Sequence, residues 1–147
     1  MGATTGPRTI GILNSTEDVI DLLTQLLEDE GCAVRAAYIP DFKRGRGDLA
    51  TWLGDLAPTA VLYDIPPPYD ENWAFYQHAL SLRESRPHRF IVTTTNMRIL
   101  EGLAGPTDAI ELIGRPFDLG EIVDRVRAAL AEIGAEAAPV EGRGKTE

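Results

Sequence analysis

Short apolar runs alternate along the chain with longer segments in which apolar residues recur every three or four positions. A short apolar run bounded by turn residues is typical of a strand buried on both faces, whereas the longer spacing is typical of a helix that buries one stripe. The runs predict strands over Thr9–Leu13, Cys32–Ile39, Ala60–Asp64, Phe90–Thr94 and Ala109–Ile113. The helical spacing predicts helices over Val19–Leu27, Leu49–Leu56, Trp73–Leu82, Asn96–Leu103 and Leu119–Ile133.

Strands that alternate with helices predict an α/β domain with one doubly wound parallel sheet and helices on both faces. The crossovers should be right-handed. These rules leave the strand order open, and the flavodoxin-like order 2-1-3-4-5 of a five-stranded sheet is a common solution. We expect this domain over residues 9–133. Residues 1–8 and 134–147 are small, polar and unpatterned, so we expect a flexible leader and a disordered tail there.

The composition is that of an ordinary globular protein, with 44% hydrophobic and 25% charged residues in a chain of 147. The net charge of -9 argues against a nucleic-acid partner, because such proteins present a basic face to the phosphates. No apolar run approaches the roughly 18–20 residues that cross a bilayer, and no signal peptide is recognisable. We therefore expect a cytoplasmic protein without membrane association. Cys32 is the single cysteine, so no intrachain disulfide can form.

A carboxylate, Asp64, closes the third predicted strand, and the proline loop 66–68 follows it. In open parallel sheets, ligands and chemistry lie just beyond the carboxyl ends of the strands. The other strands that end at this edge are also followed by polar side chains. These are Asn14, Ser15, Thr93, Thr94, Thr95 and Arg115. The pattern predicts one shallow polar site at the carboxyl edge of the sheet.

This arrangement resembles the receiver domain of two-component response regulators. The resemblance extends over about residues 9–133. It rests on the strand that closes on Asp64 with Pro68 after it, the strand that closes on Thr94, and the turn Arg115-Pro116-Phe117 before the last helix. Each motif is weak alone, and their order and spacing together are fairly specific.

The resemblance implies a role for each of these positions. Asp64 stands where receivers accept a phosphoryl group from a histidine kinase. The hydroxyl of Thr94, or of Thr93 if the register differs by one, stands where it would hydrogen-bond that group. Arg115 stands where a lysine contacts the phosphate, and Pro66 stands where a backbone carbonyl binds Mg²⁺.

The sequence departs from the receiver pattern at the remaining positions. Asn14 and Ser15 replace the acidic pair that helps to hold Mg²⁺, and Arg115 replaces the lysine. Leu112 replaces the aromatic residue that commonly acts as a rotamer switch. Pro116 is the residue that follows a cis bond in typical receivers, although most X–Pro bonds are trans.

The loss of the acidic pair predicts a degenerate metal site. Mg²⁺ prefers carboxylate oxygens, and a charge pair at 4 Å is worth roughly 4 kcal/mol at an effective dielectric of about 20. A site made from Asn14, Ser15, Asp64 and Pro66 should hold Mg²⁺ weakly if at all, so we expect no required cofactor and weak or absent phosphorylation. Arg115 could instead pair with Asp64 without metal or phosphate.

We therefore expect an atypical, stand-alone receiver that signals through protein–protein contacts and is not an enzyme. Its partner would be a signalling protein such as a histidine kinase or an output protein. By resemblance, a homodimer could form through Asn96–Leu103, Ala109–Ile113 and Leu119–Ile133. Two alternatives stay open: a phosphorylation-competent receiver that uses Asp64 and Mg²⁺, and a small-molecule binder on a flavodoxin-like scaffold.

Overall fold

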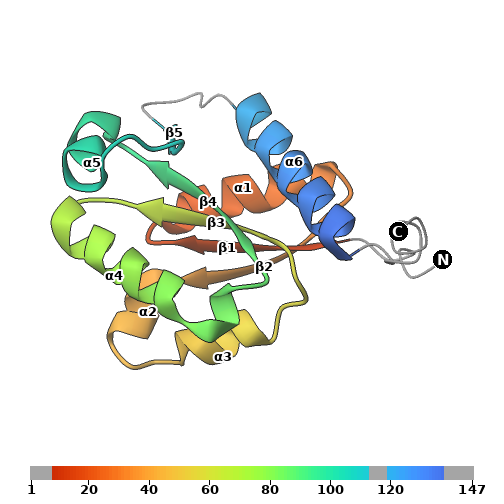
Figure 1. The fold of residues 1–147 in the computed structure, drawn as a ribbon, viewed down its shortest axis with the longest axis horizontal. Helices are drawn as coiled ribbons and strands as arrows, with labels where there is room; N and C mark the ends of the chain where they lie inside the picture. Colours follow the sequence, from red (N-terminus) through yellow and green to blue (C-terminus); the bar gives the residue numbers. More distant parts are fainter. Residues whose placement is uncertain (1–7, 113–118, 138–147) are drawn as a thin grey trace, which may run out of the picture.

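The computed structural model describes residues 8–112 and 119–137. Within them, a sheet of five strands has the order β2-β1-β3-β4-β5, and all neighbouring strands are parallel (Figure 1). The strands are β1 (Thr9–Asn14), β2 (Ala33–Tyr38), β3 (Ala60–Ile65), β4 (Arg89–Thr94) and β5 (Ile110–Glu111). This topology confirms the predicted flavodoxin-like α/β fold.

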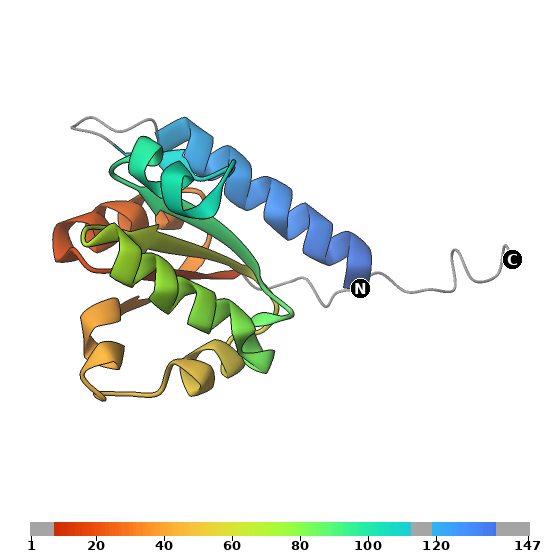
Figure 2. The same cartoon turned by 60° about the vertical axis from the view of Figure 1, so that its left-hand side comes forward.

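Helices cover both faces of the sheet (Figures 1 and 2). They are α1 (Glu17–Asp29), α2 (Ile39–Lys43), α3 (Leu49–Gly54), α4 (Tyr69–Ser81), the single 3₁₀ turn η2 (Arg83–Ser85), α5 (Met97–Ala104) and α6 (Leu119–Ala137). The helices α1 and α6 pack on one face, and α2 to α5 pack on the other. None of the helices in the described ranges has the length and apolar character that a membrane span needs.

The central strand β3 separates two hydrophobic cores. All of its residues are buried. Val61, Tyr63 and Ile65 belong to the core under α2 to α5, whereas Ala60 and Leu62 belong to the core under α1 and α6. This division follows from the alternation of side chains along a strand. It explains why β3 reads as a continuous apolar run up to its last two residues.

A short helix, α2, was not expected from the sequence. The predicted second strand extends to Ile39, but in the structure Ile39 is the buried first residue of α2. Pro40 lies in the first turn of this helix, where its fixed φ is favourable and its missing N–H is not needed. The helix ends at Lys43, and a loop leads to α3, so two short helices stand between β2 and β3.

Other element boundaries differ in length. α4 begins at Tyr69 rather than Trp73, and Asp70 and Glu71 stabilise its first turn through the helix dipole. α6 continues past Ile133 to Ala137, which corrects the expected start of a disordered tail at residue 134. The described part of β5 is Ile110–Glu111.

His88 joins the end of α3 to the start of β3. It is buried, its Nδ1 accepts a hydrogen bond from the Thr59 backbone N–H at 3.2 Å, and its Nε2 lies 2.8 Å from the Leu53 carbonyl oxygen. The first bond fixes the tautomer, so Nε2 carries the proton and donates to Leu53. This histidine satisfies backbone groups in the core and has a structural role.

Candidate functional site at the carboxyl edge of the sheet

Asp64 lies at the carboxyl edge of the sheet, one residue before the end of β3. Its side chain is 7% exposed. The register of β3 and β4 pairs Asp64 with Thr93, and the Thr93 Oγ1 donates a hydrogen bond to Asp64 Oδ1 at 2.6 Å. Within the described residues, no ion pair joins the Asp64 carboxylate. The carboxylate is therefore stabilised there by one hydroxyl.

The electrostatic environment of Asp64 favours its neutral form. Burial raises the pKa of the Asp64 carboxyl from 3.8 to about 6, and the hydrogen bond from Thr93 offsets part of this rise. Burial removes the water that would solvate the charge, while the hydroxyl stabilises the ionised form. Loss of the Asp64 charge is therefore expected near pH 6 rather than near pH 4.

The structure places Thr93, rather than Thr94, beside Asp64. Neighbouring residues of a strand point to opposite faces, and Thr94 Oγ1 donates to the Ile65 carbonyl oxygen at 2.9 Å. This corrects the expectation that Thr94 supplies the hydroxyl at the site. The sequence left a shift of one residue open, and the parallel register of β3 and β4 decides it.

Asn14 and Ser15 follow β1 at the same edge. The register pairs Leu13 with Tyr63, so the next step along both strands brings Asn14 level with Asp64. Asn14 is buried, and its Oδ1 accepts a hydrogen bond from the Thr16 backbone N–H at 2.9 Å. The Asn14 amide therefore shapes the turn into α1.

The carbonyl of Pro66 is hydrogen-bonded within the chain. Asn72 Nδ2 donates to Pro66 O at 2.9 Å. Lys43 Nζ in turn contacts Asn72 Oδ1 and lies 3.3 Å from Glu71 Oε2. A side-chain network from α2 through α4 thus fixes the loop that follows Asp64.

Asn72 is a site residue that the sequence analysis missed. It is buried on the same stripe of α4 as Tyr76 and Ala79. A buried amide on an otherwise apolar helical stripe needs a partner, and this spacing was the available signal. A second missed contact joins the start of α4 to the loop after β4, where the Tyr69 hydroxyl lies 2.7 Å from Thr95 Oγ1.

Leu112 lies directly after β5 and is buried in the core under α1 and α6. Its backbone N–H donates to the Thr94 carbonyl at 2.8 Å. The predicted positions Arg115 and Pro116 lie outside the described residues. Within those residues, the cis peptide bond is Pro67–Pro68.

The donor set at this edge is poor in carboxylates. Of the residues expected to hold metal, only Asp64 has a carboxylate. The described residues contain no group of three or more His, Cys, Asp or Glu side chains placed to hold a metal ion. The edge therefore offers a buried carboxyl, a hydroxyl, an amide and a carbonyl.

The comparisons with known proteins found similar structures. No family model matches the sequence, and no curated protein matches it. A receiver domain protein (CheY-like) from Methanospirillum hungatei superposes with a TM-score of 0.62 at 23% identity, over 90% of this chain and 100% of that chain. The chain has the fold of a response-regulator receiver domain.

Two further structures share this receiver fold. The response regulator TrrA from Thermotoga maritima, in complex with Mg²⁺ and BeF, gives a TM-score of 0.56 at 17% identity, over 81% of this chain and 98% of that chain. The chemotaxis protein CheY4 from Vibrio cholerae gives a TM-score of 0.55 at 16% identity, over 82% of this chain and 99% of that chain. The chain therefore covers nearly the full length of each receiver.

The raised pKa of Asp64 predicts a pH-dependent gain in stability for Asp64→Asn. A group whose folded pKa is raised stabilises the fold below its unfolded pKa, and this contribution is lost as the pH rises through the folded pKa. The wild-type chain should lose stability between pH 4 and about 6 relative to the variant. We expect the variant to be more stable by about 2–3 kcal/mol at pH 8 and nearly equal at pH 4. Urea unfolding across this range measures the difference, and a pH-independent difference would contradict it.

The hydrogen bond between Thr93 and Asp64 predicts coupling between these two residues alone. In double-mutant cycles with Asp64→Ala at pH 8, Thr93→Val should show an interaction energy of about 1 kcal/mol. Thr94→Val, the matched control one residue along β4, should be additive within about 0.5 kcal/mol. Unfolding free energies give both values. Stronger coupling at Thr94 than at Thr93 would show that the register is wrong.

Proposed function

We propose that this chain is an atypical receiver domain that signals through protein–protein contacts, with weak or no phosphorylation of Asp64. The observation that carries the proposal is the burial of Asp64 and the kind of side chains that surround it. In this proposal Asp64 is the phosphoacceptor position, and among the described residues it is buried beside a neutral amide and a hydroxyl rather than beside further acids. In this proposal the chain acts by contact rather than by turnover.

The residues present fit a tightly held Mg²⁺ poorly. Mg²⁺ is usually bound through one or two carboxylates and dehydrates reluctantly. Among the four expected ligand residues Asp64 has the one carboxylate, and burial raises its pKa to about 6, so protons compete with a metal for it as the pH falls toward 6. The Asn14 Oδ1 and the Pro66 carbonyl each already accept a hydrogen bond within the chain. Phosphoryl transfer depends on positive charge that neutralises the transferring group, so this donor set supports weak phosphorylation.

An exposed apolar surface supports the proposed contact with a partner. Ile99 and Leu103 lie one turn apart on α5 and are 44% and 43% exposed. The surface formed by α5, β5 and α6 is the one through which the resemblance implies a homodimer. A second copy or a signalling protein that covers this apolar pair would remove it from water, which is favourable.

A second candidate is a phosphorylation-competent receiver. The contact between the Thr93 hydroxyl and Asp64 favours it, since this hydroxyl could equally bind a phosphoryl oxygen. The two candidates differ in whether Asp64 takes up a phosphoryl group in the presence of Mg²⁺.

Incubation with acetyl phosphate and millimolar Mg²⁺, followed by intact mass measurement, tests the proposal. We expect the wild-type chain to show at most a trace of the mass of one added phosphoryl group. A variant with Asn14→Asp and Ser15→Asp restores acids at the metal site, so its phosphorylated fraction should rise about ten-fold or more.

The control is Asp64→Ala in the restored variant, which should abolish the added mass. A Mg²⁺-dependent mass gain in the wild-type chain that disappears in Asp64→Ala would overturn the proposal in favour of the second candidate. Failure of the restored variant to gain mass would show that the missing acids are not the cause.

A further inference from the structure

The outer edge of β2 carries backbone hydrogen-bonding groups without a partner in the described residues. β2 is the last strand on its side of the sheet. The Ala33 N–H donates to Arg8 O at 2.8 Å, toward β1. Because backbone groups alternate in direction along a parallel strand, the N–H groups of Val34, Ala36 and Tyr38 point away from the sheet.

This edge lacks the features that usually protect an edge strand. Natural edges are blunted by lysine, proline, bulges or a covering segment. β2 has one charged residue, Arg35, and its guanidinium lies over the Trp52 ring at 5.6 Å from the centroid. At the middle of the strand, Ala36 is small and exposed. Another strand could therefore approach β2 closely.

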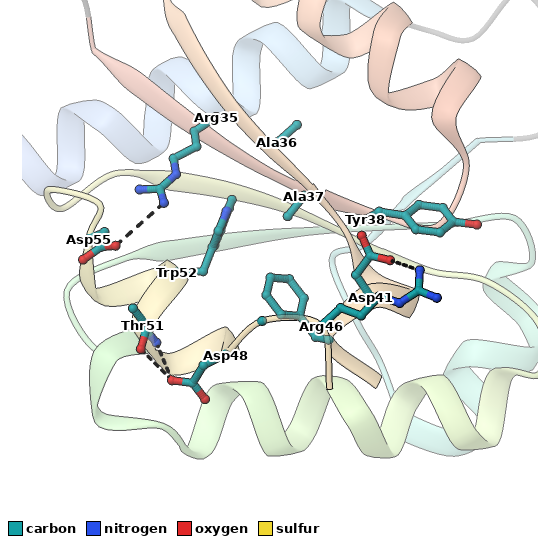
Figure 3. A pocket seen from close by; sticks show the side chains of 12 residues that line it. Arg35, Ala36, Ala37, Tyr38, Asp41, Arg46, Asp48, Thr51, Trp52 and Asp55 are labelled. Atoms are coloured by element: carbon teal, nitrogen blue, oxygen red, sulfur yellow. Dashed lines mark hydrogen bonds and ion pairs between the residues drawn. The ribbon is translucent and has the colours of Figure 1, made fainter. Parts of the chain in front are cut away.

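A cavity of about 540 Å³ adjoins this edge, between β2 and the α2–α3 segment (Figure 3). In Figure 3, Arg35 and Ala37 extend toward α3, and Ala36 points away from it. The rings of Phe42 and Trp52 line the cavity, and their centroids are 6.4 Å apart with the rings edge to face. The cavity therefore offers an apolar aromatic wall beside a row of backbone donors and acceptors.

The charges around the cavity leave one carboxylate without a cation. Arg35 pairs with Asp55 at 3.8 Å and Arg46 pairs with Asp41 at 3.7 Å. Asp48 has no ion pair within the described residues. Its Oδ2 accepts hydrogen bonds from the Thr51 hydroxyl at 2.7 Å and the Thr51 backbone N–H at 3.0 Å, and these bonds lower the pKa of the Asp48 carboxyl. The cavity rim thus keeps a negative charge.

We propose that the outer edge of β2 binds an extended segment of a partner protein as an additional strand. The backbone of the segment would bond to Val34, Ala36 and Tyr38, as in strand-addition complexes. One of its apolar side chains would enter the cavity and pack against the wall formed by Phe42 and Trp52, and a basic side chain would reach Asp48. The outward backbone groups of β2 match those of another extended polypeptide, which is why the proposed partner is a protein segment. The Asp48 carboxylate, which has no ion pair within the described residues, favours a segment with a basic side chain. This site is independent of the state of Asp64.

The test uses a peptide selected from a displayed library of random short peptides against the full chain. Selected sequences should alternate apolar and basic residues. In ¹⁵N NMR spectra, binding should slow amide exchange at Val34, Ala36 and Tyr38, whose N–H groups have no bonded partner among residues 8–112 and 119–137. This readout needs no variant, so it holds even if a substitution impairs folding.

Two variants with matched controls sharpen the test. Ala36→Pro removes one outward N–H without breaking a bond to β1, and proline is tolerated at such edge positions. It should weaken binding about ten-fold or more, whereas Ala36→Thr, which keeps the N–H, should bind within about two-fold of the wild type. Asp48→Asn keeps the helix cap and removes the charge, so it should weaken binding about two- to five-fold at low salt.

Several results would overturn the proposal. These are a failure to select any peptide, shifts that map away from β2, or full binding by a folded Ala36→Pro variant. If these same amides become protected without peptide, and the protection rises with protein concentration, the edge would instead bind a second copy of the chain. Each of these results leaves the proposal about Asp64 unchanged.

Discussion

A buried carboxyl group at the end of the central strand is the constraint on which the carboxyl edge of this sheet depends. Asp64 is 7% exposed and has one described hydrogen-bond donor, Thr93. Burial without a described cation makes the charged form costly, and this raises the pKa of the Asp64 carboxyl to about 6. The charge at this edge is therefore present at neutral pH and is lost as the pH falls through about 6, which is well above the range of an ordinary aspartate.

The surrounding polar groups stabilise the loops of the chain itself. Asn14 shapes the turn into α1, while Asn72 holds the Pro66 carbonyl and is contacted by Lys43. These bonds satisfy buried groups that would otherwise need water or a ligand. The edge has the layout of a receiver fold, and the Asn14 Oδ1, the Pro66 carbonyl and the Asp64 Oδ1 each accept one hydrogen bond within the chain. For this reason we favour signalling by contact over signalling by phosphoryl transfer.

The sequence was sufficient for the architecture, because strands buried on both faces produce strong apolar runs and because few topologies accommodate such an alternation. It was insufficient where a shift of one residue changes which side chain lies at the site, and where a contact depends on how two elements pack. The Thr93–Thr94 pair could not be resolved, since a shift of one residue exchanges the faces of a strand. The helix α2 has only five residues, and its first residue, Ile39, is β-branched and apolar, so the sequence pattern assigned it to the preceding strand. Asn72 contacts Pro66 only through the packing of α4 against the β3–α4 loop.

The Asp64 edge and the β2 edge differ in how open they are. Asp64 is buried, whereas the edge of β2 offers open backbone groups and, within the described residues, a carboxylate at Asp48 that has no ion pair. The direct test of the central claim is the titration of the Asp64 side-chain ¹³C resonance in the full chain. The account predicts a midpoint near pH 6. A midpoint below the ordinary value of 3.8 would contradict it, and would indicate that a cation such as Arg115 pairs with the carboxylate.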